Sequence, residues 1–293
     1  MKDTTKNKLS LKTKTLNIFR KVLIVICIDR IIPIIIRLIP QLYKIAPNNY
    51  QYANPSFRKV TRNGVQIKLN IHDYIGHWIY FNFKDKGRDE LIRLSKGLKN
   101  HVIFDIGANN GYTGLILAKN SGKKIYSFEP DPDNFNELRE NVELNPKLDV
   151  QIYNFGLGEE NGEFLMERPC KENMGGNRIA VQPTQDTYKV IIKKLSDFVK
   201  ENEIEHPVGL IKIDVEGFEQ KILNGCTDII EQFKPKLFIE VDDNNLKLQN
   251  DSAKQLIACL EKNYTKLYNA ENNKAVYSGQ DFTNCHFDVI ALP

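Results

Sequence analysis

The sequence contains no G-x-G-x-x-G loop, no Cys-x-x-Cys pair and no apolar stretch long enough to cross a bilayer. The missing glycine pattern disfavours a nicotinamide-dependent oxidoreductase. No Asn-Pro-Pro-Tyr-type tetrapeptide is present to hold an extruded base, which disfavours an enzyme that modifies nucleic-acid bases. We expect reduced thiols and a cytoplasmic protein, because no metal-ligand spacing connects the cysteines, which are Cys27, Cys170, Cys226, Cys259 and Cys285.

The net charge of +4 is concentrated at the start of the chain. Residues 1–21 carry seven cations and one acid, so the remainder is net negative by two. We therefore expect no nucleic-acid partner for the body of the protein. Residues 1–17 are polar and basic, and their composition predicts disorder.

Residues 18–46 are rich in apolar side chains but are interrupted by charges and prolines. Charge-free runs such as Val22–Ile28 and Ile31–Ile36 are far shorter than the ~20 apolar residues of a spanning helix. A signal peptide would need a small-residue cleavage site, which is missing. Two interpretations remain open: peripheral membrane association through residues 1–46 by an interfacial helix with a basic lead, or a helix packed on the globular body.

Residues 102–130 predict half of a nucleotide-binding α/β unit. Strand-like residues 102–106 lead into a glycine loop, a helix and a second strand that ends at Glu129. The loop reads Gly107-x-x-x-Gly111, and Asp105 precedes it. The carboxylate of Asp105 would repel phosphate and suits a cationic ligand such as S-adenosylmethionine. The predicted cofactor-binding residues here are Asp105, Gly107, Asn109, Gly111 and Glu129, with Glu129 accepting hydrogen bonds from the ribose. Structural roles in the turn are the alternative for Asp105 and the glycines.

Strands alternate with helices along the rest of the chain, which predicts a doubly wound, Rossmann-like α/β sheet with helices on both faces. Asp131 and Pro132 signal a helix start, as do Ser196 and Ser252, and Asn63-Gly64 signals a hairpin turn. Extra strands are expected at 163–167 and 187–192. We expect three parts: a basic tail with an apolar helical segment at 1–47, a hairpin and helix subdomain at 48–100, and the cofactor-binding domain at 101–293.

Two further groups of residues follow predicted strands. Asn154, Phe155 and Gly156 come after the third strand, where an adenine ring would lie, although a structural turn is an alternative. Asp214 and Glu216 follow the strand 208–215 and are the predicted catalytic residues. Either acid could act as a general base, or both could bind a divalent cation with a later acid such as Asp242. Glu216 could instead cap the next helix.

The motifs DIGANNG, YSFEPDPDNFNELRENVELN, IKIDVEGFEQKILNG and LFIEVDD, in this order over residues 100–245, resemble the FkbM family of methyltransferases. The resemblance implies a class I methyltransferase fold and S-adenosylmethionine-dependent O-methylation of a carbohydrate, glycan or glycolipid-type acceptor. One departure is Leu195-Ser196, where the family usually has Leu-Asp. The alternative function is a noncatalytic, membrane-peripheral binding protein that retains the fold. His72 and His77 are expected to pack the N-terminal subdomain, with acceptor binding as the alternative.

Overall fold

The computed structural model describes residues 10–204 and 206–293. Lys2, Lys6 and Lys8 of the basic tail lie outside the described residues. The chain divides into a smaller unit, residues 10–60 with Leu69–Lys84, and a larger unit, Thr61–Lys68 with Asp85–Pro293. The three-part division expected from the sequence stays a prediction.

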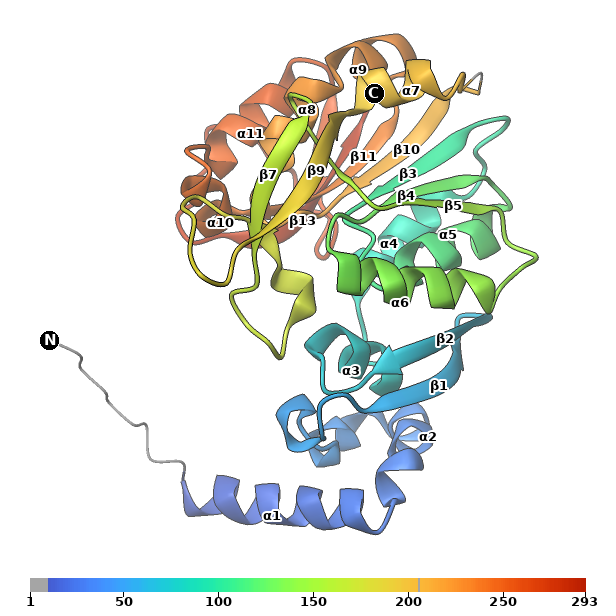
Figure 1. The fold of residues 1–293 in the computed structure, drawn as a ribbon, viewed down its shortest axis with the longest axis vertical. Helices are drawn as coiled ribbons and strands as arrows, with labels where there is room; N and C mark the ends of the chain where they lie inside the picture. The colour runs from blue at the N-terminus through green and yellow to red at the C-terminus, as the bar shows by residue number, and fades with distance from the viewer. Residues whose placement is uncertain (1–9, 205) are drawn as a thin grey trace, which may run out of the picture. The chain divides into compact units, whose positions relative to one another are not determined.

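The larger unit is built on a seven-stranded sheet (Figure 1). Its order is β12-β13-β11-β10-β3-β4-β5. Neighbouring strands from β5 to β11 are parallel, and β13 runs antiparallel to both of its neighbours. The strands are β3 (Val102–Ile106), β4 (Ile125–Phe128), β5 (Val150–Tyr153), β10 (Val208–Ile213), β11 (Lys236–Asp242), β12 (Lys266–Asn269) and β13 (His286–Leu292). The predicted doubly wound, Rossmann-like sheet with helices is confirmed.

Apolar residues on both faces of the strands hold the helices in place. On β3, Phe104 and Ile106 belong to the core that includes α7, α8, α9 and α11, whereas Ile103 belongs to the core that includes α4 and α5. Successive side chains of a strand point to opposite faces, so a fully apolar strand buries both. The helices of this unit are α4 (Lys86–Ser95), α5 (Tyr112–Ser121), α6 (Pro132–Glu143), α7 (Leu195–Glu201), α8 (Glu219–Gly225), α9 (Thr227–Phe233), α10 (Asp243–Leu248) and α11 (Ala253–Glu261).

The predicted helix starts have mixed outcomes. Asp131 caps α6 by accepting from the N–H groups of Asp133 and Asn134, and Ser252 caps α11 by accepting from Gln255. The expected cap at Ser196 is wrong, because α7 already begins at Leu195. The Ser196 hydroxyl instead donates to the carbonyl of Gly225 and contacts Asp228.

A second sheet joins four short strands in the order β6-β9-β7-β8. They are β6 (Gly156–Gly158), β7 (Gly162–Glu167), β8 (Arg178–Ile179) and β9 (Tyr188–Lys194), so the expected extra strands are present. Arg168 and Tyr188 from this region contact the buried carboxylate of Asp131, at the start of α6. These contacts anchor the second sheet beside the end of β4.

The hairpin consists of β1 (Phe57–Arg62) and β2 (Val65–Asn70), and its Asn63-Gly64 turn is confirmed. Both turn residues have positive φ, 47° and 79°, as a type I′ turn requires. The tip of the hairpin belongs to the larger unit, where Asn145 and Asn141 accept from the N–H groups of Gln66 and Lys68.

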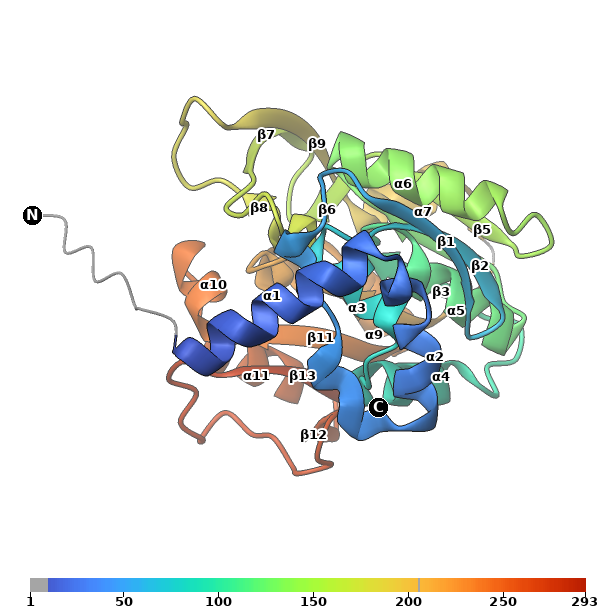
Figure 2. The same ribbon diagram turned by 90° about the horizontal axis from the view of Figure 1, so that it is seen from below.

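The smaller unit contains α1 (Leu11–Val25), α2 (Ile32–Leu38) and α3 (Tyr74–Phe81). The expectation of disorder is wrong for residues 11–17, because α1 begins at Leu11 and Ser10 caps it by accepting from Thr13 N–H. Figure 2 shows α1 as one unbroken helix. No helix among the residues that the structure describes has the length and apolar character needed to cross a membrane.

Candidate functional site

The loop after β3 packs tightly against the end of β10. Gly107 has a φ of +77°, and a Cβ at this position would lie 1.8 Å from the carbonyl oxygen of Asp214. The N–H groups of Gly107 and Ala108 both donate to the carbonyl of Phe128, at 3.1 and 3.0 Å. Only glycine fits this combination of left-handed backbone and close approach. The tight turn is therefore present, and contact of Gly107 with a cofactor stays a prediction.

Gly111 ends the same loop and leads into α5. Its φ is +83°, and an added Cβ would lie 2.4 Å from the Cδ1 atom of Leu138 on α6. Asn109, between the two glycines, has a φ of 50°, in the left-handed region. The loop thus changes direction sharply over five residues and leaves its outer N–H groups near the carboxyl ends of β3 and β4.

Lys212 on β10 is a buried cation whose position links several predicted site residues. Its ammonium group donates to the carbonyls of Gly107, at 2.8 Å, and Ile106, at 3.3 Å. It lies 3.3 Å from a carboxylate oxygen of Asp214 and 3.7 Å from one of Asp105. Burial alone would lower the pKa of Lys212, but the two carboxylates together raise it, so the group stays charged.

Asp105 lies inside the sheet and not on an open surface. Its side chain is fully buried, and the strand register places it opposite Lys212 on one side and Ser127 on the other. Ser127 donates to Oδ2 at 3.4 Å, whereas Oδ1 has no hydrogen-bond partner among the described residues. Burial raises the pKa of Asp105 although Lys212 opposes this. Asp105 therefore positions Lys212 and through it the Gly107 loop, and its direct contact with a cofactor stays a prediction.

Glu129 ties the glycine loop to the turn between β4 and α6. Its two carboxylate oxygens accept from the N–H groups of Asn109, at 2.7 Å, and Asp131, at 2.9 Å. Each oxygen retains a second lone pair, so two ribose hydroxyls fit as additional donors. Burial raises the pKa of Glu129 to about 7 despite the two backbone donors. No structural role for Glu129 was expected from the sequence, but these two hydrogen bonds give it one, because they join two loops.

The three residues after β5 lie next to Glu129. The amide of Asn154 donates to the carbonyl oxygens of Glu129, at 3.0 Å, and Pro130, at 3.3 Å. Phe155 packs its ring near Phe128, with the centroids 5.6 Å apart, and Gly156 begins β6. These contacts give the segment a structural role, which was the alternative interpretation. Adenine binding by Asn154, Phe155 and Gly156 stays a prediction.

Three acids gather at the carboxyl ends of β10 and β11. Single carboxylate oxygens of Asp214, Glu216 and Glu240 lie within 4.8 Å of one another. The strand ends at Ile213, and Glu216 has a φ of 56°, so the turn and not a continuing strand brings Glu216 beside Asp214. Glu216 does not cap α8; it accepts from the amide of Asn245 at 2.6 Å. The structure thus brings together the two predicted catalytic acids and adds a third.

The acids suppress one another's ionisation. Burial and the neighbouring Asp214 raise the pKa of Glu216 to about 8, and burial with the same neighbour raises the pKa of Glu240 well above its ordinary value. Glu216 is therefore mostly protonated at pH 7. The side chain of Asp214 is 43% exposed and contacts the Lys212 ammonium, so it is the acid that an acceptor can reach.

Asp242, which the sequence offers as an example of a later acid for a cation site, is not part of the cluster of Asp214, Glu216 and Glu240. Asp242 caps α10 by accepting from Asn244 and Asn245 N–H, and its other oxygen pairs with His286 at 2.9 Å. The third member of the acid cluster is Glu240, whose Oε2 atom has no hydrogen-bond partner among the described residues. The donor set is all oxygen, which suits Mg²⁺ or Mn²⁺.

Three residues of this site were not predicted: Lys212, Glu240 and Asn245. Lys212 had a visible signal, because a lysine within the apolar run VGLIKIDV must be buried and therefore paired. Glu240 has the same signature within LFIEVDD. Nothing in the sequence marks Asn245, because its contact with Glu216 forms only when α10 folds beside the turn after β10.

A sequence profile of the methyltransferase FkbM domain matches residues 105–268, more than half of the chain. The chain is 27% identical over 150 residues to hexuronic acid methyltransferase AglP of Haloferax volcanii, covering 50% of this chain and 59% of that protein. It is 31% identical over 145 residues to methyltransferase 1 of Beauveria bassiana, covering 43% of this chain and 58% of that protein. The chain thus spans less than two thirds of the length of these relatives. A crystal structure of methyltransferase FkbM from Methylobacillus flagellatus aligns with a TM-score of 0.41 at 16% identity, covering 74% of this chain and 52% of that one.

Replacing Gly107 with alanine tests the close approach between the loop and β10. Gly97 is a matched control, because its φ is also +77° and nothing lies within 4 Å of an added Cβ. Gly97→Ala costs only the left-handed strain, roughly 1–2 kcal/mol. Gly107→Ala adds the clash with Asp214, so we expect its free energy of unfolding to fall by at least about 2 kcal/mol more. Denaturant unfolding of both variants measures the difference, and equal losses would show that the loop is not constrained by β10.

Proposed function

This chain belongs to the methyltransferase FkbM family, and on that premise we propose that it methylates a hydroxyl of a carbohydrate-type acceptor with S-adenosylmethionine. The observation that carries the proposal is the arrangement at the ends of β3, β4 and β10: a glycine loop, a buried acid at the tip of β4 and an accessible acid beside them. The relative named hexuronic acid methyltransferase supports a sugar as the acceptor.

The residues present fit this cofactor. Glu129 offers one unused lone pair on each oxygen for the ribose hydroxyls, and the exposed carboxylate of Asp214 attracts the positive charge of the sulfonium and ammonium groups. The Gly107 loop is held at the ends of β3 and β10, beside Asp214. When bound, S-adenosylmethionine supplies an electrophilic methyl carbon that needs no further activation.

Asp214 is the proposed general base. It takes the proton of the acceptor hydroxyl while the oxygen forms its bond to the methyl carbon and the carbon–sulfur bond breaks. Lys212, 3.3 Å from the Asp214 carboxylate, holds the base at the end of β10. Glu216 and Glu240 enclose the same space, and the alternative role of all three acids is to bind a divalent cation that orients the acceptor.

We also propose that the smaller unit attaches peripherally to an anionic membrane. Along α1, Leu11, Ile18, Val22 and Val25 recur at helical spacing and are exposed by 48–82%. Residues 10–47 contain seven cations, whereas the single acid there, Asp29, is buried and lies 3.7 Å from Arg58. An exposed apolar stripe flanked by cations suits an anionic lipid surface.

Cofactor binding is tested by Glu129→Ala. Losing two charge-assisted hydrogen bonds should weaken S-adenosylmethionine binding by about 1–3 kcal/mol in calorimetric titration. Because Glu129 also joins two loops, the thermal midpoint of each variant must be measured with the affinity. Glu231→Ala removes an exposed carboxylate on α9 as the control and should bind normally. Unchanged affinity in Glu129→Ala would exclude Glu129 from the cofactor site.

The chemical step is tested by Asp214→Asn, with transfer of labelled methyl groups into glycan and lipid extracts as the assay. Removing the base should lower turnover by ~10²–10⁴-fold with nearly unchanged cofactor affinity. Glu216→Gln mimics the protonated acid, so it should resemble the unmodified protein at pH 7 and diverge above pH 8, where Glu216 ionises.

Three outcomes would change this assignment. Turnover of Asp214→Asn at the unmodified rate would exclude Asp214 from both roles. Loss of activity with a chelator and recovery with Mg²⁺ or Mn²⁺ would favour cation binding over direct proton transfer. Cofactor binding without any labelled product would favour the noncatalytic alternative.

Membrane attachment is tested by the triple variant Ile18→Ser, Val22→Ser and Val25→Ser. Because the exposed stripe loses its apolar area, partitioning onto anionic vesicles at low salt should fall about tenfold or more. The matched control replaces exposed Val181, Ile191 and Leu248 with serine and should pellet like the unmodified protein. If the unmodified protein fails to pellet with these vesicles, attachment is excluded, and release only by detergent would mean deeper insertion.

A further inference from the structure

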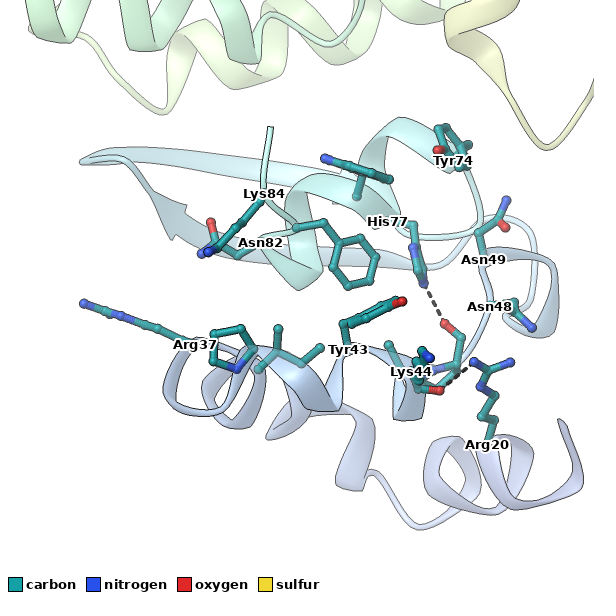
Figure 3. A pocket seen from close by; sticks show the side chains of 16 residues that line it. Arg20, Arg37, Tyr43, Lys44, Asn48, Asn49, Tyr74, His77, Asn82 and Lys84 are labelled. Atoms are coloured by element: carbon teal, nitrogen blue, oxygen red, sulfur yellow. Dashed lines mark hydrogen bonds between the residues drawn. The ribbon is translucent and has the colours of Figure 1, made fainter. Parts of the chain in front are cut away.

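The smaller unit encloses a cavity of about 600 Å³ that the methyltransferase site does not use (Figure 3). This volume is within the range of small-molecule sites. Its walls come from α2, the segment Pro40–Ile45, residues 46–49 and α3, with Arg20 reaching in from α1. Every lining residue belongs to the smaller unit.

One wall of the cavity is aromatic and apolar. Trp78 lies between Tyr74 and Phe83, with ring centroids 5.9 and 5.3 Å away. His77 adds a neutral ring, because burial lowers its pKa to about 4 and its Nε2–H donates to the carbonyl of Pro47 at 2.7 Å. Tyr43, on the opposite wall in Figure 3, completes a surface that suits an apolar chain.

All ionised side chains that line the cavity are cations: Arg20, Arg37, Lys44 and Lys84. Arg20 is already engaged, because it donates to the carbonyl of Lys44 at 2.6 Å and to Asn17 at 3.1 Å. Arg37 and Lys84 have no side-chain hydrogen bond or ion pair among the described residues. Both lie at the left of Figure 3, one on each wall. No acid is among the residues that line the cavity, so Arg37 and Lys84 are available as donors to an anionic group.

The cavity borders the exposed apolar surface of the unit. Exposed apolar residues lie next to lining residues in the sequence. Leu38, Ile39 and Leu42, which are exposed by 37–76%, adjoin the lining residues Arg37, Pro40 and Tyr43. A ligand with both an apolar chain and an anionic end is therefore the chemical class that fits. A free anion would leave the aromatic wall empty, and an uncharged chain would leave the cations unpaired.

We propose that this cavity binds a phosphorylated lipid, with the phosphate on Arg37 and Lys84 and the apolar chain along Tyr43, Trp78 and Phe83. The lipid is either a phospholipid of the bilayer or a lipid carrier linked through phosphate to a saccharide. The inference goes beyond the proposed methyl transfer and does not depend on it, because no lining residue belongs to the proposed catalytic or cofactor site.

Trp78 is the only tryptophan in the chain, so its fluorescence reports directly on this cavity. We would titrate the full chain with decyl phosphate below its aggregation concentration. The expected result is a saturable change in Trp78 emission, with neither inorganic phosphate nor decyl maltoside competing at the same concentration. Decyl phosphate with a brominated chain should quench Trp78. Binding without quenching, or equal competition by either partial ligand, would overturn the proposal.

The matched variants test the two cations. Arg37→Ala with Lys84→Ala should weaken decyl phosphate binding by about tenfold or more, because two charge-assisted contacts are lost. Lys254→Ala with Lys262→Ala removes the same charge from exposed positions of the larger unit and should stay within about twofold of the unmodified protein. Equal affinity of the cavity variant and the unmodified protein would overturn the proposal. Thermal unfolding of both variants and S-adenosylmethionine titration separate a failure of this site from a failure of the proposed function.

The source of the lipid is identified by flotation of the full chain with phosphatidylcholine vesicles that contain either polyprenyl phosphate or phosphatidylglycerol at equal surface charge. The vesicle whose binding the cavity variant reduces identifies the ligand as a lipid carrier or a bilayer phospholipid. If the cavity variant binds both vesicles as well as the unmodified protein, the cavity takes no membrane lipid and the proposal fails.

Discussion

The ammonium group of Lys212 is the interaction on which the site depends. A buried cation in the middle of a parallel sheet requires compensating groups, because an unpaired charge there costs several kcal/mol. Asp105 from β3 and Asp214 from the end of β10 supply the negative charge, and the carbonyls of Ile106 and Gly107 complete the shell. The cation therefore fixes the end of β3, the start of the glycine loop and the candidate base relative to one another. Gly107 permits this arrangement, because any side chain would separate the loop from β10.

A second buried charge, the carboxylate of Asp131, organises the segment between β4 and α6. Asp131 accepts from two N–H groups at the start of α6 through one oxygen, and its other oxygen receives Arg168, Asn177 and Tyr188. The carboxylate thus joins the helix start to the second sheet. Glu129, two residues earlier, bonds the N–H of Asp131 and that of Asn109. Glu129, the candidate ribose acceptor, is therefore held on both sides by backbone N–H groups. Asp131 in turn fixes the segment that donates one of them.

The sequence predicts the sheet well, because each strand carries its own local signal. VIFDI and VGLIKI are apolar on both faces, the Asn63-Gly64 turn has a defined backbone conformation, and Asp131 lies directly before Pro132. The helix α3 was missed, because residues 74–81 are apolar on most sides and show no polar face. The pairing of Asp105 with Lys212 was also missed, since it arises from the register between strands about a hundred residues apart. The same limit applies to Glu240 and to the structural task of Glu129.

The two proposals call for ligand groups of different charge. At the ends of β10 and β11, Asp214 is paired with Lys212, and burial together with Asp214 raises the pKa values of Glu216 and Glu240, so the cluster carries little net charge and suits a neutral hydroxyl. In the cavity of the smaller unit, cations without acidic partners attract phosphate, and an aromatic wall accepts an apolar chain. A saccharide joined through phosphate to a lipid contains all three groups. Each proposal rests on the residues of its own unit, and a lipid-linked saccharide is one class of ligand that satisfies both.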